Sequence, residues 1–222
     1  MAGSCCAAAA GRVTGRDRGS GGGVDRAVTR SVRGGRVYDG DISSVLVTEE
    51  QVREKTAELA QQVAGDYADL VRDGRESDLV LIGVLKGAVM FMTDFARALP
   101  IRPSSSSWRS APTARRPRRR VSCGSSRTST ATSAGRHVLI VEDIIDSGLT
   151  LNWLLGNLQT RSPASLEVVT LLRKPDAVKV DVPVRYVGFD IPNEFVVGYG
   201  LDYAERYRDL PYIGTLDPSV YA

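Results

Sequence analysis

The sequence is poor in the residues that build disulfide frameworks and metal centres. Its 222 residues include three cysteines, Cys5, Cys6 and Cys123, and a single histidine, His137. The cysteines show neither the repeated spacing of a disulfide scaffold nor the paired spacing of a zinc site, so we expect reduced thiols. His137 opens an apolar run, for which we expect a structural role. Disulfide-rich domains and Cys/His metal sites are therefore excluded.

Long apolar runs are also missing. No stretch approaches the roughly 20 apolar residues that cross a bilayer as a helix. The chain starts with Met-Ala-Gly-Ser-Cys-Cys and four alanines, and this start lacks the basic residues and the long apolar core of a signal peptide. We therefore expect a cytoplasmic protein that does not engage a membrane.

Large apolar side chains are scarce in residues 1–36, which are rich in Gly, Ala, Ser and Arg. Such a composition buries too little surface to offset the entropy lost on ordering the chain. We expect these residues to be a disordered extension, or upstream sequence included through a misassigned start codon. Order is expected from about Tyr38, and residues 37–222 are expected to form a single domain.

Acidic residues are missing from residues 102–134, which also lack Leu, Ile and Phe. Eight of the 29 Lys and Arg lie in this segment and all 26 Asp and Glu lie outside it, so the rest of the chain is acidic. A disordered basic loop and a nucleic-acid-binding insert are two interpretations. The segment has no Tyr or Phe on which bases could stack, and this disfavours nucleic-acid binding.

A frameshift is the third interpretation of this segment, and the one we favour. Residues 105–109 can be encoded so that a shifted frame reads Leu-Glu-Phe-Met-Ala, which is typical of a strand. Residues 124–130, read with the last base of the preceding codon, can become Arg-Ile-Leu-Lys-Asp-Leu-Asp. We hypothesise two compensating frame changes, near Arg102 and near Gly135, and expect the intervening residues as written to be disordered. Resequencing the gene tests this directly.

Hydrophobic periodicity divides the remaining chain into alternating helices and strands. Thr48 and Gln51 fit a capping box that begins a helix, and Asp73-Gly74 is expected to end it. Apolar runs, typical of strands buried on both faces, occupy residues 79–85 and 138–141, and two further strands are expected at residues 166–172 and 184–189. Helices are expected at residues 88–99 and 149–158. This alternation predicts βαβ units and therefore a parallel sheet in an α/β protein.

The strongest functional signal lies at residues 138–150, Val-Leu-Ile-Val-Glu-Asp-Ile-Ile-Asp-Ser-Gly-Leu-Thr. Four apolar residues bring Glu142 and Asp143 to the carboxyl edge of the sheet, where open α/β sheets bind ligands. The next turn places Gly148 between Ser147 and Thr150 and opens a helix, so its backbone N–H groups suit a phosphate. The carboxylates suit sugar hydroxyls or Mg²⁺. Although such turns also occur for structural reasons, the combination predicts a site for a phosphorylated sugar.

This stretch resembles the motif with which type I phosphoribosyltransferases bind 5-phosphoribosyl-1-pyrophosphate (PRPP). Further matches, to the hypoxanthine-guanine branch of that family, lie at residues 84–87, 171–175, 187–192, 195–203 and 207–214. Together the similar regions cover residues 38–101 and 135–218. The resemblance implies an α/β fold of the type I phosphoribosyltransferase kind, a mainly parallel twisted sheet flanked by helices with a small hood over the active site.

The resemblance also implies a reaction in purine salvage. The 5-phosphoribosyl group of PRPP passes to hypoxanthine or guanine, which gives IMP or GMP and releases pyrophosphate. Mg²⁺ is the implied cofactor, and a homodimer or homotetramer is the implied assembly. Two alternatives stay open: a phosphoribosyltransferase for another purine such as xanthine or adenine, and a non-catalytic PRPP-sensing regulator that binds nucleic acid.

The family's sugar and phosphate contacts carry over onto matching positions. The resemblance implies that Glu142 and Asp143 hold the ribose hydroxyls, directly or through Mg²⁺. It also implies that Asp146 is the general acid or base at purine N7. The 5′-phosphate is cradled by Ser147, Gly148, Leu149 and Thr150, and pyrophosphate is contacted by Lys86, Gly87 and Arg208. A non-proline cis peptide is implied at Leu85-Lys86.

The base contacts carry over in the same way. The resemblance implies that Lys174 donates to the 6-oxo group, which selects hypoxanthine and guanine over adenine. Phe195 stacks on the base and the backbone of Val196 reads its edge. Asp202 is a ligand of the Mg²⁺ on pyrophosphate, together with Glu142 and Asp143 at the ribose.

One departure from the family lies between Ile101 and Gly135. The family has a mobile loop with a Ser-Tyr pair that closes over PRPP and excludes water. As written, the sequence contains neither that pair nor the strand expected before it. The shifted reading frame would restore a Ser- and Gly-rich stretch, so we expect the chain as written to be impaired in activity or folding.

Overall fold

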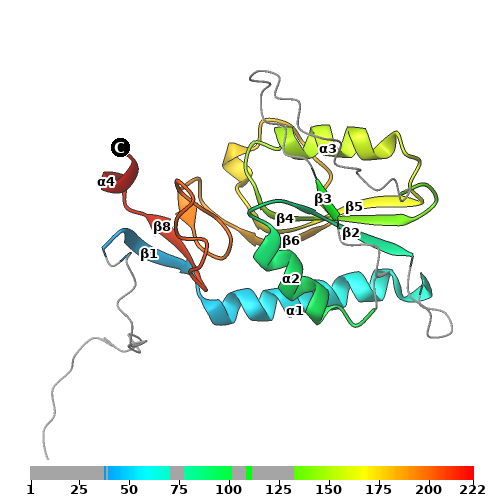
Figure 1. Cartoon of the computed structure of the whole chain (residues 1–222), viewed down its shortest axis with the longest axis horizontal. Coiled ribbons are helices and arrows are strands. Elements are labelled where there is room, and N and C mark those ends of the chain that lie inside the picture. Colours follow the sequence, from blue (N-terminus) through cyan, green and yellow to red (C-terminus); the bar gives the residue numbers. More distant parts are fainter. Residues whose placement is uncertain (1–37, 39, 71–77, 102–108, 112–132) are drawn as a thin grey trace, which may run out of the picture. The chain divides into compact units, whose positions relative to one another are not determined.

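The structure, a computed structural model, describes residue 38 and residues 40–70, 78–101, 109–111 and 133–222. These residues belong to one compact unit, Tyr38–Ala222. Its main layer is a parallel sheet in the order β3-β2-β4-β5-β6 (Figure 1), which confirms the parallel α/β architecture. The strands are β2 Leu79–Val84, β3 Arg109–Ala111, β4 His137–Ile145, β5 Ser165–Arg173 and β6 Tyr186–Asp190.

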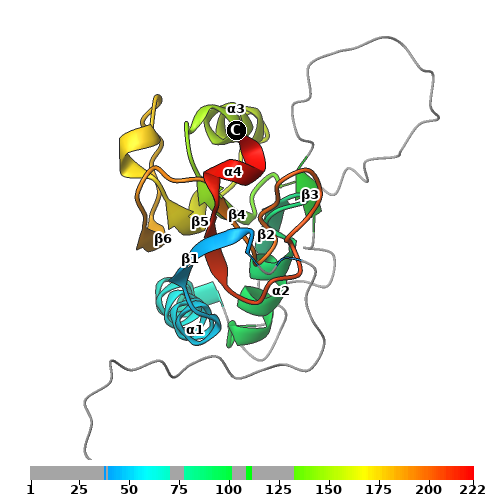
Figure 2. The same ribbon diagram turned by 90° about the vertical axis from the view of Figure 1, so that its left-hand side faces the viewer.

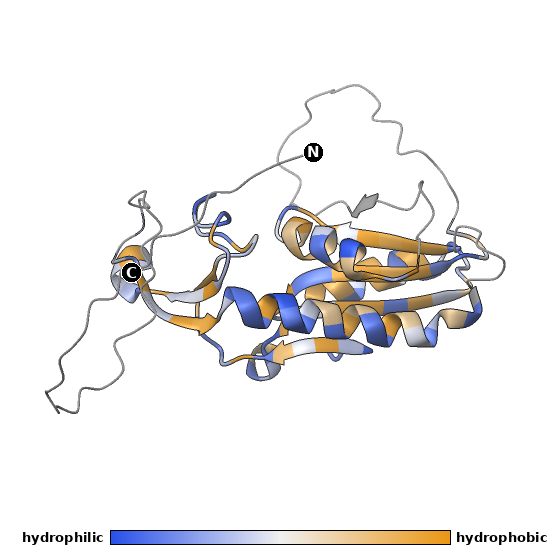
Figure 3. Ribbon diagram, turned by 90° about the horizontal axis from the view of Figure 1, so that it is seen from below, coloured by the Kyte–Doolittle hydropathy of each residue, from blue (hydrophilic) through white to orange (hydrophobic). Residues whose placement is uncertain are grey.

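Different helices cover the two faces of this sheet, because successive strand residues point to opposite sides. On one face α1 (Glu49–Asp66) and α2 (Val89–Ala98) pack against strand residues such as Leu81 and Leu139. On the other face α3 (Leu149–Gln159) packs against neighbours such as Ile82 and Ile140 (Figure 1). Figure 3 shows how apolar residues fill the strands between the helices. Burial on both faces explains the uninterrupted apolar runs of β2 and β4.

The first helix begins as predicted and ends earlier. The Thr48 Oγ1 accepts the Gln51 N–H at 3.3 Å and the Gln51 Oε1 accepts the Thr48 N–H at 2.8 Å, so the capping box is confirmed. The predicted end at Asp73-Gly74 is wrong, because α1 ends at Asp66 and a short 3₁₀ helix, η1 Ala68–Leu70, follows. Glycine in the last turn weakens the helix, and Tyr67 then leaves the helical conformation with φ −107° and ψ 14°.

The strand that carries the acidic pair is longer than predicted. The strand predicted at residues 138–141 stops before Glu142, but β4 continues to Ile145. The reason is the ladder with β5, in which Ile144 pairs with Leu172 and Ile145 with Arg173. Both carboxylates therefore lie on the last part of a regular strand, and their direction is set by the sheet.

A second, smaller sheet lies at the carboxyl end of the parallel one, to its left in Figure 1 and in front of it in Figure 2. It consists of β1 (Ile42–Val47), β8 (Ile213–Leu216) and β7 (Val196–Val197), antiparallel in the order β1-β8-β7, and α4 (Pro218–Tyr221) follows β8. This is the small hood that the resemblance implied. The residue pattern had not indicated its strands, because β7 and β8 are too short to show a period of two.

The unusual basic segment contributes one element to the described structure. Arg109–Ala111 forms β3, which pairs with Ile82–Val84 of β2. The expectation that the sequence as written contains no strand here is therefore wrong for these three residues. Strand pairing uses backbone N–H and C=O groups and does not require a particular side chain. Residues 102–108 and 112–132, and the extension at 1–37, lie outside the described residues.

Membrane-spanning helices are not found in the described ranges, since none of their helices is both long and apolar enough to cross a bilayer.

Candidate active site

The acidic pair at the end of β4 is held close to the turn after β2. Glu142 is buried, and the Asp143 Oδ1 accepts the N–H of Ile144 at 2.9 Å. Gly87 lies so close that a Cβ at its position would overlap the Asp143 carboxylate. Glycine is therefore required there. The Leu85–Lys86 peptide just before it is cis, as the resemblance implied.

The two carboxyl groups carry strongly shifted pKa values. Burial, together with the charge of the neighbouring Asp143, raises the pKa of Glu142 to about 9. Burial raises the pKa of Asp143 to about 6, although the Ile144 N–H and the charge of Arg208 act in the opposite direction. Burial thus disfavours the charged form of both carboxyl groups. Sugar hydroxyls or a cation placed beside these groups would be stabilised.

The turn from β4 into α3 has the geometry of an anion site. Gly148 is the residue before the helix, and its φ of 76° is a left-handed conformation that favours glycine. A Cβ there would lie 2.6 Å from the carbonyl oxygen of Val180. No side chain caps the first N–H groups of α3, which therefore remain available to a ligand.

A first cleft of about 250 Å³ opens over this turn. It is lined from three places: the end of β2, the end of β4 and the start of α3. The lining residues include Gly87, Glu142, Asp143, Asp146, Ser147, Gly148 and Thr150. We call it the phosphate cleft. Leu149 begins α3 at the same turn, but its side chain is 54% exposed and does not line the cleft.

A second cleft of about 310 Å³ adjoins the first. Gly87, Asp143, Ile144 and Asp146 line both, so the two clefts share a wall. The other lining residues come from the loops after β2 and β5 and from the hood: Lys86, Lys174, Phe195, Val196, Leu201, Asp202 and Arg208. We call it the base cleft. Asp146 lines both clefts, one at the uncapped start of α3 and the other beside an aromatic ring.

The base-binding candidates lie on separate elements. Lys174 follows β5 and is 8% exposed, with its N–H bonded to the carbonyl of Ile145 at 2.9 Å. Phe195 precedes β7, and its carbonyl accepts the Leu216 N–H at 2.9 Å. Val196 is buried in β7, the outer strand of the hood, so one edge of its backbone faces away from β8. A planar base can therefore meet a ring, a cation and a free backbone edge.

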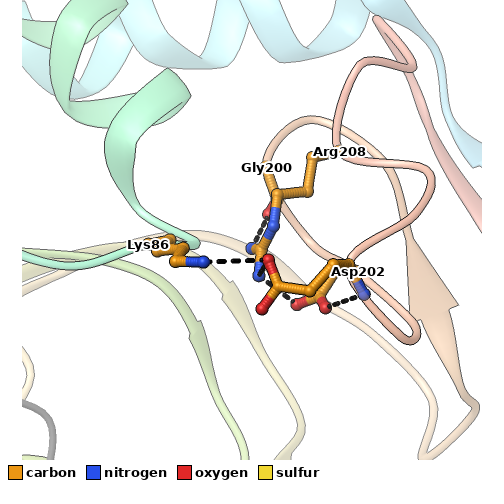
Figure 4. A network of polar contacts seen from close by, with 5 residues as sticks. Lys86, Gly200, Asp202 and Arg208 are labelled. Carbon is orange, nitrogen blue, oxygen red and sulfur yellow. Dashed lines mark hydrogen bonds and ion pairs between the residues drawn. The ribbon is translucent and has the colours of Figure 1, made fainter.

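An ion-pair network joins the remaining candidates (Figure 4). The Arg208 guanidinium contacts the Asp202 Oδ1 at 2.6 Å and the Gly200 carbonyl at 2.6 Å. Lys86 pairs with Glu205 at 3.0 Å, and Arg208 lies 3.6 Å from the same carboxylate. The hydrogen bond with Lys86 lowers the pKa of Glu205. Both cations are thus paired with carboxylates.

Comparisons with known proteins agree with this geometry. Residues 51–204 match the model of the phosphoribosyl transferase domain. The chain is 54% identical over 195 residues to the hypoxanthine-guanine phosphoribosyltransferase of Mycobacterium tuberculosis, which covers 83% of this chain and 91% of that protein.

The chain belongs to the hypoxanthine-guanine phosphoribosyltransferase family.

Solved structures of the same family have the same fold. A hypoxanthine phosphoribosyltransferase from Staphylococcus aureus superimposes with a TM-score of 0.68 at 37% identity and covers 85% of this chain and 98% of its own. The Trypanosoma cruzi hypoxanthine phosphoribosyltransferase in complex with the product IMP has a TM-score of 0.67 at 39% identity, with coverage of 82% and 94%. The predicted family and fold class are confirmed.

Two features of this phosphoribosyltransferase site escaped the sequence reasoning. Glu205 pairs with Lys86 and Arg208, and its only sequence signal is its position three residues before Arg208. Tyr221, near the end of the chain, stacks on Phe195, and no local motif marks it. Within the described ranges no group of three or more His, Cys, Asp or Glu side chains forms a ready-made metal site.

Proposed function

We propose that this chain transfers the 5-phosphoribosyl group of PRPP to hypoxanthine or guanine through the residues of the phosphate cleft and the base cleft. The supporting observation is the position of Asp146, which lines both clefts at their shared wall. A carboxylate there can reach a purine and the sugar carbon that the purine attacks. The family and the two adjoining clefts support the same reaction.

The phosphate cleft would bind the sugar phosphate. Gly148 and the uncapped N-terminus of α3 offer backbone N–H groups to the 5′-phosphate, with the hydroxyls of Ser147 and Thr150 beside them. Leu149 contributes only its backbone, which fits its exposed side chain. Glu142 and Asp143 would accept hydrogen bonds from the ribose hydroxyls, and their charge would favour a ribose that becomes cation-like at C1.

The base cleft would bind the purine and the leaving group. Phe195 would stack on the base, Lys174 would donate to its 6-oxo group, and the Val196 backbone would pair with its edge. On the opposite side Lys86, Gly87 and Arg208 would contact pyrophosphate. Bond formation from purine N9 to C1 breaks the bond from C1 to pyrophosphate, and Asp146 would take the proton from N7.

Magnesium fits the residues present. Burial raises the pKa values of Glu142 and Asp143 and so disfavours their charged forms, which a divalent cation beside them would stabilise. Asp202 offers a third carboxylate in the base cleft, where it is now paired with Arg208. When bound with PRPP, Mg²⁺ would neutralise the departing pyrophosphate. Glu142, Asp143 and Asp202 are the side chains that would hold it.

Product formation tests the proposal. The purified chain is incubated with PRPP, MgCl₂ and hypoxanthine, guanine, xanthine or adenine, and nucleoside monophosphate and pyrophosphate are measured. We expect IMP and GMP, with little product from adenine because Lys174 has no 6-oxo group to bind. Product from xanthine alone would favour the alternative that the chain is a phosphoribosyltransferase for another purine. PRPP binding without any product would favour the PRPP-sensing regulator, whose nucleic-acid binding is then measured directly.

The basic segment needs a parallel test. We propose that residues 102–134 arose by two compensating frame changes and that restoring the frame adds a loop over PRPP. The chain as written and the frame-restored chain are compared in the same assay, and the gene is resequenced. We expect higher turnover from the restored chain. Tryptic peptides of the written segment in the native protein, identified by mass spectrometry, would overturn the frameshift.

Assembly and location complete the proposal. We propose a cytoplasmic homodimer or homotetramer that binds neither nucleic acid nor membranes. Light scattering coupled to size-exclusion chromatography measures the assembly, and a monomer would contradict it.

A further inference from the structure

The ring that lines the base cleft is itself packed between two other rings. Tyr221 stacks on Phe195 with ring centroids 5.0 Å apart and planes inclined by 27°. Tyr203 meets Phe195 edge-on, at 5.6 Å and 90°, and lies 6.3 Å from the Tyr221 ring. We call these three side chains the aromatic cluster. Offset stacking and edge-to-face packing are the preferred geometries of aromatic pairs.

The cluster presents only Phe195 to the base cleft. Phe195 lines that cleft and is 38% exposed, whereas Tyr203 and Tyr221 are not among its lining residues. A ring has two faces. Because Tyr221 covers one of them from outside the cleft, the other face of Phe195 is the one left for a ligand.

The position of Tyr221 is fixed by the hood. Asp217 caps α4 by accepting the N–H of Ser219 at 2.8 Å, and its own N–H is bonded to the Asp41 carbonyl at 2.8 Å. Val220 packs against the apolar cluster of the hood. The Leu216 N–H is bonded to the Phe195 carbonyl at 2.9 Å, so the strand that leads into α4 also holds Phe195. Tyr221 is therefore part of an element that hydrogen bonds and apolar packing hold in place.

We propose that Tyr221 is a positioning residue for the purine. It holds the Phe195 ring in the plane that a base requires, and Tyr203 blocks rotation at the ring's edge. The inference rests on the proposed function, because it assigns the free face of Phe195 to the base. A side chain held in place before binding loses less rotamer entropy when the ligand arrives. Purine affinity should therefore depend on Tyr221, whereas affinity for the sugar phosphate should not.

Calorimetry with two ligands separates these contributions. GMP should occupy both clefts, whereas ribose 5-phosphate should occupy only the phosphate cleft. In Tyr221→Ala we expect the Kd for GMP to rise about three- to tenfold, the range of one aromatic pair. The Kd for ribose 5-phosphate should stay within about twofold of the wild type, since the hood does not line the phosphate cleft.

Matched variants distinguish stacking from simple filling of space. Tyr221→Phe keeps the ring and should bind GMP like the wild type. Tyr221→Leu keeps apolar volume without a ring and should remain weakened. In Phe195→Leu the further change Tyr221→Ala should add little, because the pair is already broken. Val45→Ala removes an exposed apolar side chain from the same hood sheet and serves as the control for general truncation effects.

The outcomes are separable. Equal GMP affinity in Tyr221→Ala and the wild type would overturn the inference, and so would full rescue by leucine. An equal loss of affinity for both ligands would show that Tyr221 has a general structural role, and this would also overturn the inference. A wild-type chain that binds neither GMP nor ribose 5-phosphate would overturn the proposed function, and the inference with it.

Discussion

The phosphate cleft and the base cleft are built in different ways. The phosphate cleft comes mostly from one continuous stretch, residues 142–151, in which a strand, a turn and a helix start follow one another. The base cleft draws on four separate stretches, around Lys86, residues 143–146, Lys174 and residues 195–208. In the first, the groups proposed to bind the phosphate are mostly backbone N–H groups; in the second, side chains from distant parts of the chain must be brought together. Substitutions in the two clefts should therefore affect ligand binding and activity in different ways.

The largest effect is expected where the clefts meet. Asp146→Asn keeps the shape of the side chain but removes the base, so kcat should fall by about 10²- to 10⁴-fold. The KM for PRPP should change by less than about threefold, because the phosphate is held by other groups. Initial rates of IMP formation measure kcat and the KM for PRPP. Asp69→Asn, the same substitution at an exposed position, is the control. Unchanged turnover would remove Asp146 from the mechanism.

The next effect probes the backbone of the phosphate cleft. Gly148→Ala puts a Cβ on a residue with φ 76° and within 2.6 Å of the Val180 carbonyl oxygen, so the turn must shift. We expect the Kd for ribose 5-phosphate to rise about 10- to 100-fold, the equivalent of about 1–3 kcal/mol of strain. Gly156→Ala, in the same helix, meets nothing within 4 Å and should instead stabilise the chain by about 0.5–1 kcal/mol. If both variants bound ribose 5-phosphate with comparable affinity, the turn at Gly148 would not be the anion site.

The same contrast explains what could be predicted from the sequence. The apolar runs of β2 and β4 indicate a sheet buried on both faces, and the acids near the end of β4 and the glycine after it lie within twelve residues of the start of β4. These are local patterns, so the fold class and the phosphate cleft were predictable. The start of α1 was predictable for the same reason, since its capping box lies within four residues.

The hood was predictable only through family resemblance. β1 pairs with β8 across most of the chain, with Ile42 opposite Leu216, and such pairing leaves no periodic signal in short strands. Glu205 and Tyr221 are defined by the same long-range packing, so their roles could not be derived from neighbours in sequence. The boundaries that failed, at Asp66 and Ile145, were set by a cap conformation and by the β5 ladder.

A smaller effect concerns stability in the phosphate cleft. The pKa of Glu142 is about 9 in the folded chain against an ordinary 4.5, so between these pH values only the folded state keeps the proton. The free energy of unfolding must then fall as pH rises across this range. Glu142→Gln removes that dependence. In EDTA we expect the two proteins to be equally stable near pH 4, with the variant more stable by about 1–3 kcal/mol at pH 9. Denaturant melts at several pH values measure this, and a constant difference across pH would contradict it.

The smallest effect is expected at the ion pairs of the base cleft. Glu205 holds Lys86 at 3.0 Å and approaches Arg208 at 3.6 Å, where pyrophosphate is proposed to bind. The carboxylate is therefore a competing anion, although at 58% exposure water and salt weaken its hold. Glu205→Gln should lower the KM for PRPP by about two- to fivefold at low salt, with the gain disappearing at high salt as charges are screened.

A matched exchange decides whether this gain belongs to the site. Glu58→Gln removes another exposed carboxylate, paired with Lys55 at 2.6 Å on α1, and should leave the KM for PRPP unchanged. A rise in KM for Glu205→Gln would mean that this carboxylate aims Lys86 and Arg208 at pyrophosphate instead of competing with it. In that case the cations of the base cleft would be arranged for pyrophosphate before it binds, and the two clefts would differ less in how they are built.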